Sequence, residues 1–313
     1  MKQFLTLHDL KDFDAQVQLA KDIKANPYQF EQLGKRKTLG LLFFNPSLRT
    51  RLSTQKAARL LGMDVMVMNF SNEAWAIEYE DATIMEGLRS EHVKEAAQVV
   101  SQYCDVVGIR AFATLTDKEK DESEQVLQKF IEHASVPILN MESATAHPLQ
   151  ALADALTLTE HDLPKKPKVV LTWAPHPKAL PHAVGNSFTR MMQHLDADFV
   201  IANPQGYDLD PRITKGIPIV HNQNEALKNA DVVYAKNWSS YEEYGQILRT
   251  DNEWMLNPEK MALTNNAKFM HCLPIRRNVV VADGVLDHPN SMVIEQANNR
   301  TYAAAAVLKT LIS

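Results

Sequence analysis

Short apolar runs alternate with helical patterns along nearly the whole chain of 313 residues. Strands that alternate with helices form parallel sheets with helices on both faces. The pattern therefore predicts an α/β fold with two doubly wound domains, each with a central parallel sheet flanked by helices. The expected strands are 38–44, 64–68, 106–110, 137–140, 169–173, 199–202, 217–220, 232–235 and 269–272. The expected helices are 15–23, 50–61, 92–103, 122–133, 149–159, 182–195, 224–229 and 296–311.

A chain of this length is expected to contain about two domains. The helix 149–159 leaves the first of them, and the polar, proline-marked stretch 161–167 connects it to the next strand. We therefore expect one domain over residues 1–150 and a second over 151–295, with the C-terminal helix, 296–313, packing back on the first. Ligand sites in such sheets lie beyond the carboxyl ends of the strands.

Charge and cysteine content argue against several classes of protein. A net charge of −5 and a pI near 6.1 are not those of a nucleic-acid binder or of a protein that binds acidic membranes. The two cysteines, Cys104 and Cys272, form no disulfide framework and suggest a reducing compartment. No signal peptide or membrane span is visible. We therefore expect a cytoplasmic enzyme.

Hydroxyls and guanidiniums gather where the strand 38–44 leads into the next helix. Unpaired backbone N–H groups and the helix dipole favour an anion at such a place. Arg49 and Arg51 add bidentate recognition of oxyanions, and Ser47 and Thr50 add neutral hydrogen-bond donors. The expected ligand is a phosphate group, and the alternative is a helix-capping turn with solvated arginines.

A second cluster lies between Glu142 and Gln150. Pro148 fits the first turn of a helix, and His147 and Gln150 are spaced so that both could face one ligand. A histidine can donate to a carbonyl oxygen, and a glutamine carbonyl can accept from an amide nitrogen. The pair therefore suits a planar carbamoyl or amide group. The alternative is a capping turn that contains a core histidine.

A third cluster, 270–278, begins at a strand end and contains Arg276 and Arg277. The two arginines form either an anion clamp or a solvated face. Cys272 is interpreted as a small buried hydrophobe and not as a nucleophile. Neither His271 nor Cys272 has companions at the spacing of zinc ligands, so no metal site is expected.

Three other places carry polar or aromatic side chains that could bind a ligand. The proline-rich loop 173–181 holds His176 and Lys178, and its alternative role is a rigid surface connection. Lys236 closes a strand and could simply reach solvent. Trp75 stands among polar residues, so its indole N–H could donate to an anion on a neighbouring subunit, or the ring could be buried in its own domain.

Taken together, these pieces resemble the aspartate/ornithine carbamoyltransferase family. Three segments match its signatures for carbamoyl phosphate, for the carbamoyl group and for the ornithine branch. They are Ser47-Leu48-Arg49-Thr50-Arg51, His147-Pro148-Leu149-Gln150 and His271-Cys272-Leu273-Pro274. Their order and separation agree with the family across nearly the whole chain. The resemblance implies two α/β domains, with carbamoyl phosphate bound by the domain 1–150 and the acyl-ornithine by the domain 151–295. It also implies a homotrimer with active sites shared between subunits, and no metal or organic cofactor.

The chain departs from ordinary ornithine enzymes, because it lacks their Ser-Met-Gly loop. The loop with His176 resembles instead the branch that uses N-acetylornithine or N-succinylornithine. Acetyl-specific enzymes have a glutamate at the position of Ser90 and a modified lysine at that of Val280, and the succinyl enzymes have a proline at the position of Ser90. A glutamate would repel the extra carboxylate of a succinyl group, whereas Ser90 is neutral and Val280 cannot be carboxylated. The resemblance therefore implies transfer of a carbamoyl group to the δ-amino group of N-succinyl-L-ornithine, giving N-succinyl-L-citrulline and phosphate in arginine biosynthesis.

The resemblance also implies a role for each site residue. Arg110, His147 and Gln150 would be catalytic, with Arg110 and His147 stabilising the oxyanion. The residues implied for carbamoyl phosphate are Ser47, Leu48, Arg49, Thr50, Trp75 of a neighbouring subunit, Arg110, His147, Pro148, Leu149, Gln150, Cys272, Leu273 and Arg300. Those implied for the acyl-ornithine are Glu142, His176, Lys236, Arg276 and Ser90.

Other functions remain open at this point. N-acetylornithine carbamoyltransferase would use the same mechanism with a smaller acyl pocket, and plain ornithine carbamoyltransferase is disfavoured by the missing loop. A nucleotide-dependent oxidoreductase would need a glycine fingerprint after a strand, which the chain lacks. An inactive oligomeric scaffold is the remaining alternative.

Overall fold

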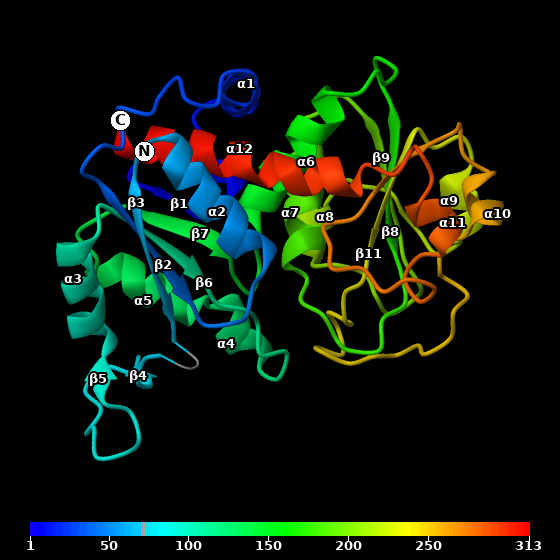
Figure 1. Ribbon diagram of the computed structural model, residues 1–313. Helices are drawn as coiled ribbons and strands as arrows, with labels where there is room; N and C mark the ends of the chain where they lie inside the picture. Colours follow the sequence, from blue (N-terminus) through cyan, green and yellow to red (C-terminus); the bar gives the residue numbers. More distant parts are fainter. Residues whose placement is uncertain (71–72) are drawn as a thin grey trace. The chain divides into compact units, whose positions relative to one another are not determined.

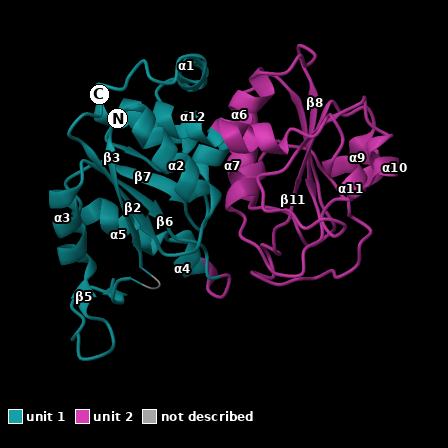
Figure 2. Ribbon diagram, in the orientation of Figure 1, with its two compact units in different colours: residues 1–114, 119–152, 300–313 teal, residues 115–118, 153–299 magenta. Residues whose placement is uncertain are grey.

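The computed structural model describes residues 1–70 and 73–313. The chain forms two compact units (Figure 2). Unit 1 comprises Met1–Thr114, Glu119–Leu152 and Arg300–Ser313, and unit 2 comprises Leu115–Lys118 and Ala153–Asn299. The units divide at residues 152 and 153, and the assignment of one substrate to each domain stays a prediction.

Unit 1 is built on a five-stranded parallel sheet with the strand order β1-β7-β6-β2-β3 (Figure 1). Its strands are β1 (Gln3–Phe4), β2 (Thr38–Phe43), β3 (Asp64–Asn69), β6 (Val106–Arg110) and β7 (Ile138–Glu142). β2 is almost entirely buried because both of its faces are covered, as its uninterrupted apolar sequence predicts. The strand order reverses between β2 and β6, and ligands bind beyond the strand ends at such a reversal.

Helices cover both faces of this sheet (Figure 1). α3 (Val93–Tyr103) and α5 (Gln125–His133) lie on one face; α1 (Phe13–Ala25), α2 (Arg49–Leu60) and the C-terminal part of α12 (Val293–Ile312) lie on the other. The remaining elements are the short helix η1 (Leu7–Asp9), α4 (Lys118–Glu122) and α6 (Pro148–Thr159), which begins in unit 1.

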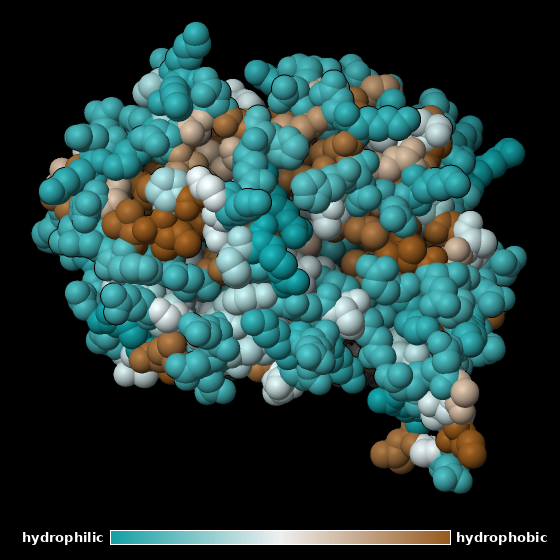
Figure 3. All heavy atoms as spheres, turned by 180° about the vertical axis from the view of Figure 1, so that it is seen from behind, coloured by the Kyte–Doolittle hydropathy of each residue, from teal (hydrophilic) through white to brown (hydrophobic). Residues whose placement is uncertain are grey.

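An arm projects from unit 1 around the two-stranded parallel sheet of β4 (Ile77–Glu78) and β5 (Glu91–His92). Apolar side chains are exposed at its end (Figure 3), where Ile84 is 81% and Leu88 97% accessible.

Unit 2 repeats the doubly wound plan with the strand order β10-β9-β8-β11-β12. Its strands are β8 (Lys168–Trp173), β9 (Asp198–Ala202), β10 (Ile219–Val220), β11 (Val232–Lys236) and β12 (Lys268–Met270). Its helices are α7 (Ala183–Met192), α8 (Pro211–Thr214), α9 (Gln223–Leu227), α10 (Pro258–Met261) and α11 (Asp283–Leu286). The predicted fold class, with two parallel sheets flanked by helices, is confirmed.

Some predicted boundaries are wrong. The expected helix 122–133 begins only at Gln125, as α5, because Glu124 has a left-handed backbone with φ 53° and separates it from α4, which ends at Glu122. The expected strand 269–272 ends at Met270, since the N–H of His271 donates to the Gln296 side chain and not to a neighbouring strand. Pattern analysis also missed β1, β4, β5, α8, α10 and α11, which have only two to four residues each.

In the described part of the chain, no helix combines the length and apolarity needed to cross a membrane.

Candidate active site

Three strand ends of unit 1 are joined where the strand order reverses. The backbone N–H of Phe44 donates to the carbonyl of Arg110 over 2.9 Å, and that of Ala111 donates to the carbonyl of Glu142 over 3.0 Å. These bonds continue the sheet one residue beyond β2 and β6. They place Arg110 and Glu142 side by side at the edge where parallel sheets bind ligands.

Helix α2 begins at this edge without a side-chain cap. Its N-cap residue is Leu48, which has no polar atom in its side chain to satisfy the N–H groups of the first turn. Ser47 precedes it, and Arg49 and Thr50 form the first turn. Such a start exposes backbone donors and the positive end of the helix dipole to a ligand.

Two arginines from distant parts of unit 1 converge on Thr50. Arg110 Nη1 donates to Thr50 Oγ1 over 3.0 Å, and Arg300 Nη2 donates to the same oxygen over 2.6 Å. All three residues are at least nine-tenths buried. Two buried guanidiniums that meet at a helix start offer charged donors that suit an anionic ligand.

Arg51 belongs to the same helical turn but contacts other groups. Its guanidinium donates to the Asn69 side chain and lies over the ring of Phe43. Arg51 therefore contacts Asn69 and Phe43, whereas Arg110 and Arg300 meet at Thr50.

A tight turn between β7 and α6 brings Glu142 and His147 together. The N–H of Ser143 donates to the carbonyl of Ala146 over 2.8 Å, so the chain reverses between the two residues. His147 Nε2 then lies 3.2 Å from Glu142 Oε2, which also accepts from Arg110 Nη1 over 2.5 Å. Pro148 and Leu149 follow in the first turn of α6, where Gln150 is almost fully buried.

The surroundings of His147 favour the neutral form of its imidazole. Burial lowers its pKa well below 6.5, and the positive charges of Arg300 and Arg110 act in the same direction. Arg300 Nη2 is 3.3 Å from His147 Nε2. A neutral imidazole can donate a hydrogen bond to a developing oxyanion without adding a formal charge.

Glu142 was predicted among the acyl-ornithine residues, and the structure brings it into contact with two residues predicted for the donor. It pairs with Arg110 and His147, whereas Trp75 and Ser90 lie in the projecting arm. There the indole N–H of Trp75, which is 58% exposed, donates to Glu91 Oε2 over 2.7 Å.

Unit 2 gathers basic side chains at the corresponding edge of its own sheet. The N–H of Ala174 donates to the carbonyl of Lys236 over 3.1 Å, which joins the ends of β8 and β11. Arg276 Nε donates to His176 Nε2 over 3.3 Å. Burial lowers the pKa of His176, and the charges of Lys236, Arg276 and Lys178 lower it further. These basic groups suit a carboxylate ligand.

The two adjacent arginines of unit 2 have different surroundings. Arg277 is held by Asp283 at 2.7 Å and by Asp287 at 2.7 Å, and hydrogen bonds from Arg277 lower the pKa of both carboxyls. Only Arg276 therefore faces His176. Nearby, the N–H of Leu273 donates to His271 Nδ1 over 2.9 Å, and Cys272 is buried and is not part of a disulfide.

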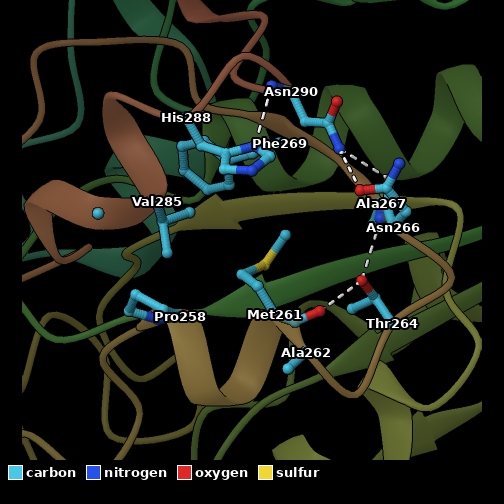
Figure 4. A pocket seen from close by; sticks show the side chains of 11 residues that line it. Pro258, Met261, Ala262, Thr264, Asn266, Ala267, Phe269, Val285, His288 and Asn290 are labelled. Carbon is cyan, nitrogen blue, oxygen red and sulfur yellow. Dashed lines mark hydrogen bonds between the residues drawn. The ribbon is translucent and has the colours of Figure 1, made fainter.

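A separate hollow of about 360 Å³ lies between β12, α10 and α11 (Figure 4). Its floor is apolar, with Phe269 and Val285, and polar residues such as His288 stand at its rim. The described residues that line it include none of those predicted for either substrate.

Sequence reasoning missed Glu124, whose carboxylate binds the turn before His147. The pattern of residues 122–133 predicted a continuous helix, and a glutamate in such a helix carries no signal of a tertiary contact.

Two family models match the chain. Residues 2–160 match the model for the carbamoyl-phosphate-binding domain of aspartate/ornithine carbamoyltransferases, and residues 181–311 match that for their aspartate/ornithine-binding domain. The chain belongs to the aspartate/ornithine carbamoyltransferase family. The prediction of a carbamoyltransferase is thereby confirmed.

Relatives within this carbamoyltransferase family cover the whole chain. N-succinylornithine carbamoyltransferase from Bacteroides fragilis is 46% identical over 100% of this chain and 99% of its own. N-acetylornithine carbamoyltransferase from Xanthomonas campestris is 38% identical over 100% of this chain and 98% of its own. A solved N-acetyl-L-ornithine transcarbamylase, in which one glutamate is mutated to serine, is complexed with carbamyl phosphate and N-succinyl-L-norvaline. It has a TM-score of 0.92 and 38% identity, with 99% of this chain and 100% of that chain covered.

Proposed function

We propose that this enzyme transfers the carbamoyl group of carbamoyl phosphate to the δ-amino group of N-succinyl-L-ornithine. The products are N-succinyl-L-citrulline and inorganic phosphate, as one step of arginine biosynthesis. The observation that carries the proposal is the convergence of Arg110 and Arg300 on Thr50, beside the neutral His147. That arrangement suits an activated acyl donor whose leaving group is an anion.

The donor is held mainly by the start of α2. Backbone N–H groups and the side chains of Ser47, Arg49, Thr50 and Arg300 bind the phosphate, with Leu48 contributing its backbone. The indole N–H of Trp75 donates to the phosphate in a neighbouring subunit. That role requires Trp75 to exchange its bond to Glu91 for the ligand.

Arg110 and His147 polarise the carbamoyl oxygen. Amine attack on the carbamoyl carbon makes a tetrahedral oxyanion, which these two donors stabilise. Gln150 and the backbone carbonyls of Cys272 and Leu273 hold the carbamoyl NH₂ group, with Pro148 and Leu149 shaping the turn around it. Collapse of the intermediate breaks the bond from carbon to the phosphate oxygen and leaves a carbon–nitrogen bond.

The acceptor amine must lose a proton before it attacks. A free alkyl ammonium has a pKa of about 10, so most of it is protonated at neutral pH. The cationic site favours loss of this proton to solvent before attack. The amine nitrogen releases a second proton as the carbon–nitrogen bond forms, and the departing phosphate accepts that one. No side chain is required as a dedicated base. Lys236 and Arg276 bind the carboxylates of the acyl-ornithine, together with His176 and Glu142.

Ser90 and Val280 favour N-succinylornithine over N-acetylornithine as the acceptor. Neither side chain carries a negative charge that would repel the extra carboxylate of the succinyl group, and Val280 is buried. The relatives that act on N-succinylornithine are 46% and 47% identical to this chain, and that from Xanthomonas campestris, which acts on N-acetylornithine, is 38% identical. A homotrimer in the cytoplasm, with active sites shared between subunits and no cofactor, completes the proposal.

A parallel assay of the ureido product tests the acceptor. Carbamoyl phosphate is offered with ornithine, N-acetylornithine and N-succinylornithine, and the highest kcat/KM is expected with N-succinylornithine. A preference for N-acetylornithine would instead assign that substrate. Absence of product with all three amines would overturn the proposed function.

Calorimetry tests the donor site. Arg49→Ala is expected to abolish turnover and to weaken carbamoyl-phosphate binding, because it removes a guanidinium from the first turn of α2. Arg51→Ala is the matched control, since Arg51 bonds to Asn69 instead. Unchanged affinity in Arg49→Ala would refute the assignment.

A further inference from the structure

Glu124 has a backbone conformation that its residue type does not favour. It lies between α4 and α5 with φ 53° and ψ 37°, the left-handed region that glycine and asparagine adopt more readily. It occupies the N-cap position of α5, yet its side chain makes no capping bond to that helix. The conformation is therefore not explained by the local structure of α5.

The carboxylate of Glu124 instead binds the turn that precedes His147. Oε1 accepts from Ser143 Oγ at 2.7 Å, from Thr145 N at 2.8 Å and from Thr145 Oγ1 at 2.6 Å. Oε2 accepts from Ala144 N at 3.2 Å. A carboxylate is a pure acceptor with about four lone-pair directions, so four donors on one segment match its capacity.

This turn is itself constrained from the other side. Ser143 Oγ accepts from Asn140 Nδ2 at 2.9 Å, and both residues are almost fully buried. The bond from Ser143 N to the Ala146 carbonyl closes the turn, at whose two ends Glu142 and His147 stand. A shift of the turn would therefore move Glu142 and His147 relative to each other and to Arg110.

We infer that Glu124 is a positioning residue for carbamoyl transfer. Its carboxylate fixes the Ser143–Thr145 segment and thereby sets the distance between Glu142 and His147. The inference rests on the proposed function, because His147 matters for rate only if the carbamoyl group is transferred here. Glu124 touches neither substrate in this scheme and acts through the turn alone.

Two substitutions separate positioning from folding. Glu124→Gln keeps the shape of the side chain but replaces one carboxylate oxygen by an N–H₂ group. That group faces other hydrogen-bond donors, so some of the four bonds are lost. Glu124→Gly removes all four bonds and at the same time relieves the left-handed backbone, which offsets the loss of folding stability. Glu119→Gln removes the same charge from an exposed position of α4 and is the matched control.

Steady-state kinetics and thermal melts are measured on the full-length enzyme. Both Glu124 variants are expected to lose kcat by about 10- to 100-fold, since misplacement of a reacting group by about 1 Å has effects of that size. Their melting temperatures should change by no more than about 4 °C. Thr145→Val, which removes one of the four donors, should give a smaller loss of kcat. Glu119→Gln should match the wild type.

Three outcomes decide the inference. A loss of kcat with a nearly unchanged melting temperature supports it. Wild-type kcat in both Glu124 variants overturns it, and so does lower activity that only follows the loss of folded protein. Amide hydrogen exchange in residues 143–147 is measured alongside and should accelerate in both variants. If the wild type carbamoylates no ornithine derivative, the proposed function fails, and unchanged exchange then rejects the role of Glu124 separately.

Discussion

At the scale of single residues, Thr50 shows what a local motif can and cannot predict. The residues next to Thr50 in the chain are sufficient to predict that it lies at the start of a helix and offers a neutral hydrogen-bond donor. Its two hydrogen-bond donors, Arg110 and Arg300, are 60 and 250 positions away. No local pattern could reveal that the hydroxyl accepts from two buried guanidiniums. Arg300 was predicted from the family resemblance, and the fold shows that it contacts Thr50.

The hydroxyl of Thr50 therefore contributes to stability as well as to binding. Thr50→Val keeps the shape but leaves two buried guanidiniums without this acceptor. The free energy of unfolding should fall by about 1–3 kcal/mol, the usual cost of an unsatisfied buried polar group. Thr50→Ser keeps the oxygen and should lose much less. Chemical denaturation measures both variants, and a valine variant as stable as the wild type would contradict the expected role.

At the scale of elements, the buried strands were the best predicted parts of the chain. β6 was predicted with its observed bounds, because a run that is apolar on both faces and ends in a polar residue defines its own limits. Elements of two to four residues, such as β4 and α11, are too short to show a period. The break between α4 and α5 was missed for another reason, because Glu124, which separates them, bonds to residues 143–145, about twenty positions along the chain.

Helix α2 ends in a turn that requires a glycine. Gly62 has φ +77°, and a Cβ there would lie 2.0 Å from the carbonyl oxygen of Glu31. Gly216 has nearly the same φ of +80°, but nothing lies within 4 Å of its added Cβ. Gly216→Ala should cost about 1–2 kcal/mol, the penalty of the left-handed backbone alone. Gly62→Ala should cost about 1–3 kcal/mol more, because the backbone must shift. Urea unfolding compares the two; equal costs would show that the clash is relieved without a penalty.

At the scale of the whole molecule, the order of apolar runs was sufficient to predict two doubly wound units. Parts of the basic clusters at their strand ends were also located from sequence, because segments such as 47–51 and 270–278 each carry several polar residues close together in the chain. Which of two adjacent arginines meets His176 was not predictable from spacing. Arg277 is held by Asp283 and Asp287, whereas Arg276 meets His176, one hundred positions away. Such choices depend on tertiary neighbours that the sequence does not place.

Each unit also buries a histidine that resists protonation, which makes the stability of the molecule depend on pH. Burial is the main cause that lowers the pKa of His147 in unit 1 and of His182 in unit 2. Both pKa values are about 6.5 in the unfolded chain and lower in the folded one, so the unfolded state binds more protons as the pH falls. Stability is therefore complete above about pH 6.5 and declines below it.

Unfolding at several pH values measures this effect. The free energy of unfolding should decrease between pH 7 and pH 5 by up to about 1.4 kcal/mol per pH unit for each histidine. This window lies above the ordinary pKa values of aspartate and glutamate, so carboxyl groups contribute little to the slope there. His182→Gln should flatten the decline for unit 2, whereas the exposed His288→Gln in the same unit is the matched control. A wild-type protein equally stable at pH 7 and pH 5 would contradict the prediction, because a buried neutral imidazole cannot be protonated without loss of folding free energy.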